Sequence, residues 1–358
     1  MSDKEKQRLV IEALKKVPHP EKGGDLVSMG YIKNLRVEGD VATFDLALKA
    51  HKCKFREQLK KDTEEAAKSV DGISAVTVNI IEQSEQQQAR GKDPWADRAP
   101  IPGVKKVVAV ASGKGGVGKS TVAVNLAVAL VGEGLRVGLL DADIYGPSVA
   151  MMMGVPVGEQ INVLGDKIIP LERHGVKMMS VAFLMEEKSA PVIWRGPMVA
   201  NMVKQLLRQV LWGALDVIVV DLPPGTGDSQ LTLVQTVPLD GAVIVTTPQH
   251  IAALDASRGI EMFRRLEVPV IGLVENMSNF VCPDCGAKHH LFPQGGIEQV
   301  VHDYDVDVIA TVPIEPDIGT HGDSGIPTIV ATPDSLAAKA MREAAAKVIS
   351  AIIPERNV

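Results

Sequence analysis

The sequence predicts an α/β protein in which a small α+β domain precedes a larger domain built on a doubly wound, mostly parallel sheet. Short apolar runs alternate with helix-like stretches through most of the chain. Continuous apolar runs suit parallel strands buried on both faces, and their alternation with helices indicates a doubly wound sheet. The runs are Val107–Ala111, Val137–Leu140, Val217–Val220, Ala242–Thr246, Val270–Val274 and Val308–Val312.

A polar stretch separates the two predicted domains. At 358 residues the chain exceeds the usual size of one domain. The stretch from Glu82 to Pro100 is polar and rich in glutamine, which is the composition of a linker. We therefore expect a small domain at residues 1–82, a linker at 83–103 and the larger domain at 104–358.

The small domain is predicted to have the order α-β-β-α-β. Its strands alternate apolar and polar residues, as half-buried strands do, and its first two strands are joined at a glycine-containing turn. The expected elements are a helix at Asp3–Lys16, strands at Tyr31–Val37 and Val41–Leu48, a helix at Phe55–Ser69 and a strand at Ala75–Ile81.

Composition limits the classes of function. Hydrophobic residues make up 46% of the chain and aromatic residues only 3%, so the core must be built from aliphatic side chains. The net charge of −6 argues against a nucleic-acid partner held by bulk electrostatics. No apolar run approaches the roughly 20 residues that span a bilayer, and the charged N-terminus lacks the apolar core of a signal peptide. These features predict a cytoplasmic protein with no nucleic-acid and no membrane partner.

The first apolar run leads into a phosphate-binding loop. Gly113–Ser120 is Gly-Lys-Gly-Gly-Val-Gly-Lys-Ser, which fits the Walker A pattern, and the helix-like stretch Thr121–Val131 completes the strand–loop–helix context. Backbone N–H groups of such a loop bind phosphates, helped by the positive end of the helix. Lys119 would reach the β- and γ-phosphates, and Ser120 would hold Mg²⁺. The sequence thus predicts a P-loop NTPase domain that binds ATP through Gly113, Lys114, Gly115, Gly116, Val117, Gly118, Lys119, Ser120 and Thr121.

Polar residues at other strand ends complete the expected nucleotide site. Asp143 would orient the attacking water, and Asp141 would lie nearer the Mg²⁺ shell unless it merely caps the following turn. Asp221 ends a Walker B pattern and would hold Mg²⁺ through its water shell. The N–H of Gly225 could touch the γ-phosphate and make its loop sensitive to hydrolysis. Asn276 is placed either to bind a purine edge or simply to form a turn.

These segments together resemble the deviant Walker A ATPases, which include the Mrp/ApbC proteins, the nitrogenase iron protein and the MinD/ParA ATPases. The likeness to the Mrp/ApbC iron–sulfur carriers is carried by Asp-Ala-Asp-Ile-Tyr-Gly-Pro-Ser from Asp141, Trp-Arg-Gly-Pro-Met from Trp194 and Asp-Leu-Pro-Pro-Gly-Thr-Gly-Asp from Asp221. It covers about residues 104–350 and extends more weakly to the first domain.

The resemblance assigns roles within the phosphate site. Lys114, the second lysine of the loop, would reach across a dimer interface to the nucleotide of the partner; the alternative is a solvated surface lysine. Hydrolysis would then depend on Lys114, Lys119, Asp143 and Asp221.

Cys282 and Cys285 are separated by two residues in Cys-Pro-Asp-Cys-Gly, a spacing that lets two thiolates bind one metal centre. By spacing alone, an iron–sulfur cluster and a zinc site completed by His289 or His290 are nearly even, and a redox dithiol or two structural cysteines stay open. A cubane usually takes four thiolates, which a two-fold dimer would supply. The family resemblance implies this arrangement, with a labile 4Fe–4S cluster bridging a homodimer.

Cys53, the third cysteine, lies between two lysines at the start of a predicted helix, where its pKa should be lowered. The similar domain of related proteins often has a proline after this cysteine. Lys54 departs from that pattern, so we expect at most an accessory ligand.

The sequence therefore predicts an ATP-hydrolysing iron–sulfur cluster carrier that receives clusters from scaffold donors and passes them to apo-proteins. The alternative is a MinD/ParA-type spatial-organising ATPase with a structural zinc at the cysteine pair. The C-terminal stretch Ser335–Ile353 has helical character but a weak basic face for a membrane-targeting helix. A nitrogenase-like reductase would need two well-separated cluster cysteines in the ATPase domain, which this chain lacks.

Overall fold

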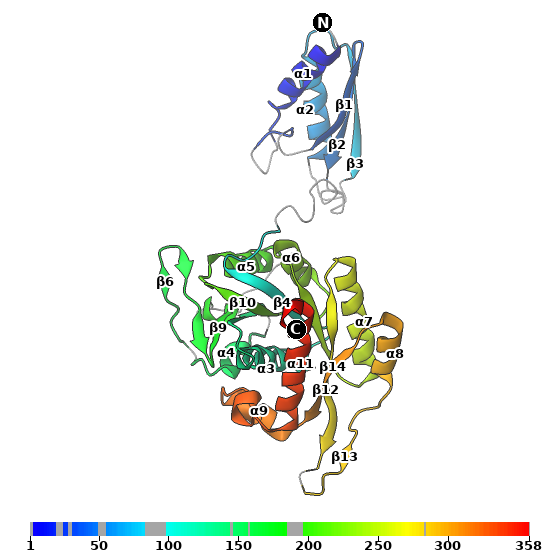
Figure 1. Cartoon of the computed structure of the whole chain (residues 1–358). Coiled ribbons are helices and arrows are strands. Elements are labelled where there is room, and N and C mark those ends of the chain that lie inside the picture. Colours follow the sequence, from blue (N-terminus) through cyan, green and yellow to red (C-terminus); the bar gives the residue numbers. More distant parts are fainter. Residues whose placement is uncertain are drawn as a thin grey trace. The chain divides into compact units, whose positions relative to one another are not determined.

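The computed structural model divides the chain into two compact units, Met1–Ala96 and Asp97–Val358 (Figure 1). The fold class expected from the sequence is confirmed, because a small α+β unit precedes an α/β unit with a mostly parallel sheet. Most of the predicted linker lies outside the described residues, as do Cys53 and Trp194. The structure describes residues 3–18, 24–27, 31–48, 55–82, 98–143, 146–156, 158–184, 196–282 and 284–357.

The first unit is a three-stranded sheet in the order β1-β2-β3, with both helices on one face (Figure 1). β1 and β2 are antiparallel and β2 and β3 are parallel. Alternate residues of β2, namely Ala42, Phe44 and Leu46, are fully buried, as the period of a half-buried strand requires. The elements are α1 (Asp3–Leu14), β1 (Ile32–Glu38), β2 (Val41–Leu48), α2 (Arg56–Lys68) and β3 (Ala75–Glu82).

The second unit is built on a nine-stranded sheet in the order β13-β12-β11-β4-β10-β5-β9-β8, with β14 paired to β12. Only the outer strands β8 and β13 run antiparallel to their neighbours. All residues of β5 and β11 are buried, as expected of strands covered on both faces. The strands are β4 (Val104–Ser112), β5 (Val137–Asp141), β8 (Leu171–Arg173), β9 (Val176–Ser180), β10 (Leu215–Asp221), β11 (Gly241–Thr246), β12 (Val270–Val281), β13 (Lys288–His289) and β14 (Val308–Ile314).

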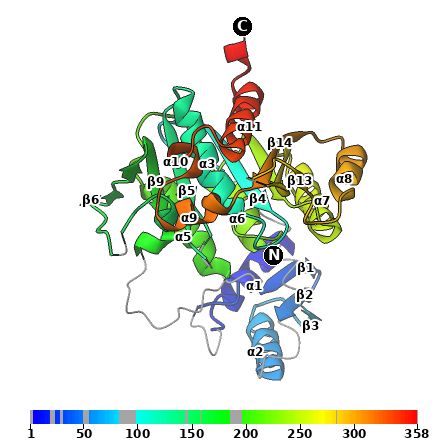
Figure 2. The same cartoon turned by 90° about the horizontal axis from the view of Figure 1, so that it is seen from below.

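Helices cover both faces of this sheet (Figures 1 and 2). α3 and α11 pack against each other, α5 packs against α6, and α7 packs against α8. The helices are α3 (Lys119–Gly132), α4 (Val149–Met152), α5 (Gly196–Gln209), α6 (Asp228–Thr236), α7 (His250–Arg265), α8 (Gly296–Tyr304), α9 (Pro316–Asp323), α10 (Thr328–Ala331) and α11 (Leu336–Ile352), with 3₁₀ turns at Val181–Leu184 and Pro354–Asn357.

Each apolar run of the larger domain that was predicted as a strand forms part of one. The expected C-terminal helix, Ser335–Ile353, is observed as Leu336–Ile352, one residue shorter at each end. Ser335 caps that helix by accepting a hydrogen bond from the N–H of Ala338 at 3.1 Å. The helix after the phosphate loop begins at Lys119, two residues earlier than expected, because the last loop residues already adopt helical geometry.

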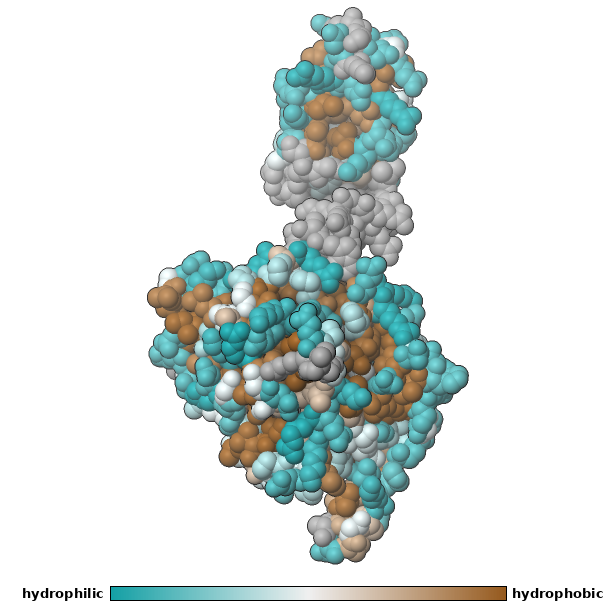
Figure 3. All heavy atoms as spheres, viewed as in Figure 1, coloured by the Kyte–Doolittle hydropathy of each residue, from teal (hydrophilic) through white to brown (hydrophobic). Residues whose placement is uncertain are grey.

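Several short strands were not predicted. β8 and β9 extend the sheet at one edge, and β13 folds back on β12 at the other. β6 (Val163–Leu164) and β7 (Lys167–Ile168) form a separate hairpin, whose Val163 and Leu164 are 68% and 66% exposed. Figure 3 shows this area as an apolar surface over β6. Among the described helices, none combines the length and apolar character needed to cross a membrane.

Candidate functional site

The phosphate loop joins the buried strand β4 to α3 and is shaped by close backbone approaches. Gly118 has a φ of 82°, and a Cβ there would lie 2.2 Å from the side-chain nitrogen of Asn276. A Cβ on Gly113 would lie 2.3 Å from the backbone of Asp255 in α7. Both positions therefore require glycine. Among the described residues no side chain caps the start of α3, which leaves its first N–H groups available to an anion.

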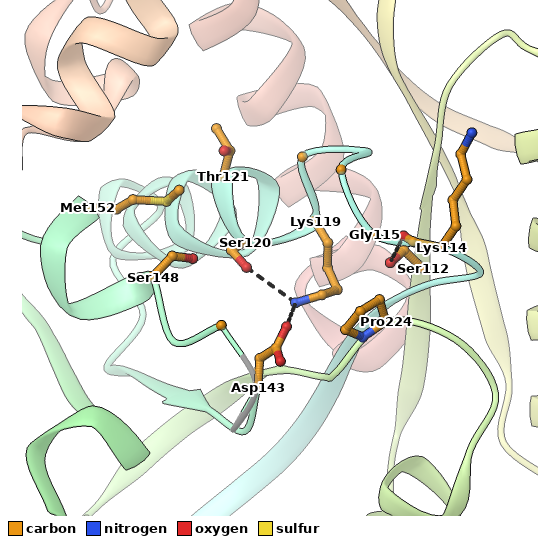
Figure 4. Close-up of a pocket in the computed structure, with 13 residues that line it drawn as sticks. Ser112, Lys114, Gly115, Lys119, Ser120, Thr121, Asp143, Ser148, Met152 and Pro224 are labelled. Atoms are coloured by element: carbon orange, nitrogen blue, oxygen red, sulfur yellow. Dashed lines mark hydrogen bonds and ion pairs between the residues drawn. The ribbon is translucent and has the colours of Figure 1, made fainter. Parts of the chain in front are cut away.

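A cavity of about 250 Å³ opens beside this loop (Figure 4). Lys119 points into it from the start of α3, whereas Lys114 extends away from Lys119 (Figure 4). Lys114 Nζ donates instead to Oε1 of Gln249 at 3.2 Å. The cavity is lined by Ser112, Lys114, Gly115, Gly116, Gly118, Lys119, Ser120, Thr121, Asp143, Gly146, Ser148, Met152 and Pro224.

Buried charges meet at the floor of the cavity. Lys119 Nζ lies 2.6 Å from Asp221 Oδ1 and 3.5 Å from Asp143 Oδ2. The hydroxyl of Ser120 donates to the other oxygen of Asp221 at 2.5 Å. Burial raises the pKa of the Asp221 carboxyl, and the adjacent lysine opposes that rise. The site thus holds one buried cation between two carboxylates.

Asp141 and Asp143 have different surroundings, although they are two residues apart. Asp143 lines the cavity, and its Oδ1 is buried without a hydrogen-bond partner in the described part of the chain. Asp141 lies outside the residues that line the cavity and is fully buried. Its carboxylate accepts hydrogen bonds from Ser180 Oγ at 2.9 Å and from the N–H of Asp143 at 3.1 Å. Burial, reinforced by the charge of Asp221, raises the pKa of Asp141 to about 7.

The loop after Asp221 is tied from two sides. Gly225 donates its N–H to the carbonyl oxygen of Ser112 at 2.8 Å. Behind the loop, Nε2 of the fully buried Gln230 donates to the carbonyl oxygens of Pro223 and Gly225, both at 2.6 Å. Pro224 between them faces the cavity. The sequence contained no signal for Gln230, since its role depends on how α6 packs under the loop.

Asn276 lies against the backbone of the phosphate loop. Its side-chain amide donates to the carbonyl oxygen of Val117 at 2.8 Å, and only 7% of the residue is exposed. A contact of Asn276 with a purine stays a prediction. The hydrogen bond instead joins β12 to the loop, a connection that the sequence did not indicate.

The cysteine pair occupies a hairpin at the far end of β12, which extends from the body of the second unit (Figure 1). The N–H of Cys282 donates to Ala287 O, and the N–H of Gly286 donates to Cys282 O, each at 2.9 Å. Both cysteines are free thiols, with Cys285 exposed and Cys282 partly so. Hydrogen bonds from the backbone N–H groups of Cys285 and Asp284 hold the pKa of the Cys282 thiol below its ordinary value.

The histidines proposed as zinc ligands, His289 and His290, are exposed in the same hairpin. His289 lies opposite Phe280 in the register of β12 and β13. Within the described residues, no three histidine, cysteine or acidic side chains are grouped so as to hold a metal ion. The hairpin therefore presents a pair of thiols and no larger ligand set within these residues.

Comparison with protein families agrees with this combination of loop and hairpin. Residues 103–349 match the profile of the NUBPL iron-transfer P-loop NTPases, and residues 7–80 match that of an iron–sulfur cluster assembly protein. The iron–sulfur cluster carrier protein of Synechocystis is 45% identical over 93% of this chain and 94% of its own length. The iron–sulfur cluster carrier protein of Haemophilus influenzae is 42% identical over 96% of this chain and 91% of its own length.

Solved structures share the fold of the second unit. A nucleotide-binding protein from Archaeoglobus fulgidus, in complex with ADP, is 38% identical and has a TM-score of 0.56 over 63% of this chain and 88% of that chain. The cell division ATPase MinD of Pyrococcus furiosus has a TM-score of 0.51 at 22% identity, covering 68% of this chain and 98% of its own. At this level of identity, the similarity to MinD shows a shared fold and nothing more.

Proposed function

This chain belongs to the NUBPL iron-transfer family of P-loop NTPases, and from that premise we propose that it carries iron–sulfur clusters to apo-proteins under the control of ATP. One observation carries the proposal. The strand β12 touches the phosphate loop at Asn276 and ends at Val281, immediately before Cys282, so one continuous segment connects the nucleotide site to the cysteine pair.

The ATPase centre uses the residues that converge on the cavity. As a P-loop NTPase, the protein is an ATPase. Lys119, now paired with two carboxylates, would turn to the β- and γ-phosphates of ATP. Asp143 would orient the attacking water, since its Oδ1 is a buried acceptor that has no partner among the described residues. Lys114 lies at the rim of the cavity and would serve the nucleotide of a second copy.

Mg²⁺ fits the acidic side of this cavity. Ser120 and Asp221 face each other at 2.5 Å, and hard oxygen ligands of this kind suit the ion. Ser120 would bind it directly, and Asp221 would bind it through water. When bound, Mg²⁺ neutralises charge on the β- and γ-phosphates.

The cluster is the cargo, and the thiols of Cys282 and Cys285 would hold it. The lowered pKa of Cys282 favours the thiolate, which is the form that binds iron. One hairpin offers half of the four thiolates that a 4Fe–4S cubane usually takes. We propose that a second copy of the chain supplies the other pair, which gives a homodimer with a bridging cluster.

Exposure of the hairpin supports transfer. Cys285 is exposed at the tip of a hairpin, where an acceptor protein can approach it. Scaffold donors would load the pair and apo iron–sulfur proteins would unload it. We place this exchange in the cytoplasm, where a reducing environment keeps cysteine pairs free.

Anaerobic reconstitution with iron and sulfide tests the proposal. We expect about four iron and four sulfide per dimer with an iron–sulfur absorption band, lost in the Cys282→Ala/Cys285→Ala variant and retained in Cys53→Ala. Stoichiometric zinc without that band would refute the carrier proposal and favour an ATPase with a structural metal.

A further inference from the structure

Three polar residues lie side by side at the carboxyl ends of neighbouring strands. The parallel register pairs Asp221 of β10 with Asp141 of β5, and Asp141 with Ser180 of β9. All three are fully buried. None of the three lines the cavity itself, but Asp221 contacts the cavity residue Lys119, whereas Asp141 and Ser180 lie one and two strands further along the sheet. Asp141 and Ser180 therefore form a layer behind the wall of the nucleotide site.

Hydrogen bonds occupy both oxygens of Asp141. Ser180 Oγ donates to Oδ2 at 2.9 Å and itself accepts from the N–H of Ala182 at 3.1 Å. The N–H of Asp143 donates to Oδ1 at 3.1 Å. The main chain at Ala142 is held as well, because its N–H donates to the carbonyl oxygen of Asp221 at 2.9 Å. Of these hydrogen-bond partners of the Asp141 side chain, Asp143 is the one that lines the cavity.

We propose that Ser180 is a positioning residue for ATP hydrolysis, which acts through Asp141 to fix the backbone of Asp143 beside the nucleotide cavity. Ser180 locks the rotamer of the Asp141 carboxylate from one side. The locked carboxylate then holds the N–H of Asp143 and so sets where the Asp143 side chain projects. Asp141 thereby acts as a link to Asp143, a different role from the place near the metal shell that the sequence suggested.

The position of Asp143 matters because of what its carboxylate faces. Oδ2 lies 3.5 Å from Lys119 Nζ, and Oδ1 is the buried acceptor aimed at no described partner. A water that attacks phosphorus must be aligned closely, and a displacement of about 1 Å can cost about a hundredfold in rate. The inference rests on the role of Asp143 in the proposed function and adds the residue that holds it in place.

Steady-state kinetics of the full chain with Mg·ATP test this role. We expect Ser180→Ala to lower kcat about tenfold with KM for ATP within about twofold, since positioning affects the reacting geometry more than binding. Ser180→Thr keeps the hydroxyl and should restore most of the rate. Ser257→Ala removes another buried serine hydroxyl, whose one hydrogen bond within the described residues is to Ala253 O in α7, and serves as the matched control. Equal ADP affinity in all variants would show that the cavity remains folded.

Magnesium dependence separates the two roles of Asp141. In Asp141→Asn, the amide can still accept from Asp143 and donate to Ser180, so we expect the Mg²⁺ concentration for half-maximal rate to stay within about twofold. A tenfold higher Mg²⁺ requirement would put Asp141 in the metal shell and overturn the inference. A wild-type kcat in Ser180→Ala would overturn the inference too. That result would not affect the proposal that the cysteine pair carries a cluster. Wild-type kcat in Asp143→Asn would instead remove the proposed role of Asp143 itself.

Discussion

Asn276 donates its side-chain amide to the carbonyl oxygen of Val117 at 2.8 Å, which joins the strand that leads to Cys282 to the centre of the phosphate loop. Asn276 also packs so closely against Gly118 that no side chain fits at that position. A change in the loop on nucleotide binding therefore has a direct mechanical contact with β12.

Asn276→Ala should loosen the phosphate loop. Loss of a buried hydrogen bond of about 1 kcal/mol predicts an ADP affinity about fivefold weaker, measured by calorimetry. Pyrophosphate binding should weaken by a similar factor, because the loop holds phosphates. Asn279→Ala, which removes a bond within the same strand to Ser278, is the control and should leave both affinities unchanged. A loss confined to ADP would point to a purine contact instead.

The thiol of Cys282 should ionise, and so react with alkylating agents, at a lower pH than an ordinary cysteine. Because backbone N–H groups favour its thiolate, alkylation by iodoacetamide in cluster-free protein should reach its plateau at a lower pH than for an ordinary cysteine. Peptide mass spectrometry at Cys282 across pH 6 to about 9.5 gives the midpoint. In urea the hairpin hydrogen bonds are lost, and the midpoint should return to about 8.5. Identical midpoints in folded and unfolded protein would contradict the assignment.

Asp141→Asn should stabilise the nucleotide-free protein at neutral and higher pH. The fold raises the pKa of Asp141 to about 7, so the wild-type protein loses stability as pH rises from about 4 through 7. Asparagine does not titrate, and the variant should gain about 4 kcal/mol over that range, since each pKa unit corresponds to about 1.4 kcal/mol. Urea unfolding at pH 5, 6.5 and 8 should show the gain growing with pH and then levelling.

Asp216→Asn serves as a control, because the fold lowers the pKa of Asp216 whereas it raises the pKa of Asp141. Arg136 and Lys105 hold the pKa of Asp216 well below its usual range, so its contribution is complete above about pH 4 and is lost only in stronger acid. This variant should be less stable than wild type by a constant amount between pH 5 and 8. A pH-dependent difference for Asp216→Asn, or none for Asp141→Asn, would contradict these shifts.

Gln230→Glu should destabilise the protein much more than Gln249→Glu. The side-chain nitrogen of Gln230 is buried between two carbonyl oxygens, and a carboxylate there would have no donor, at a cost of about 3 kcal/mol. The same change at Gln249 gives Lys114 an ion-pair partner and should shift stability by less than about 1 kcal/mol. Urea unfolding of both variants makes the comparison, and equal stability losses would show that the loop does not depend on Gln230.

The sequence predicted the elements that carry a strong local signal. Buried parallel strands appear as continuous apolar runs, and the glycines of the phosphate loop mark their own conformation, so β4, the loop and α3 could be placed from the residues alone. The short strand β9 has no such run, and for that reason Ser180 went unnoticed. The partners of Gln230 and Asn276 depend on packing between segments far apart in the chain, which no local pattern encodes.

The ion pairs of Lys119 have a thermodynamic consequence for how ligands arrive. In the structure its charge is already balanced by Asp221 and Asp143, so a phosphate must compete with two carboxylates for the same ammonium group. Once Lys119 turns away, those carboxylates need another cation, and a divalent ion supplies it. Nucleotide and metal affinities are then linked, and each ligand strengthens the binding of the other by the same factor. Free nucleotide would bind weakly, and the cavity would favour its magnesium complex.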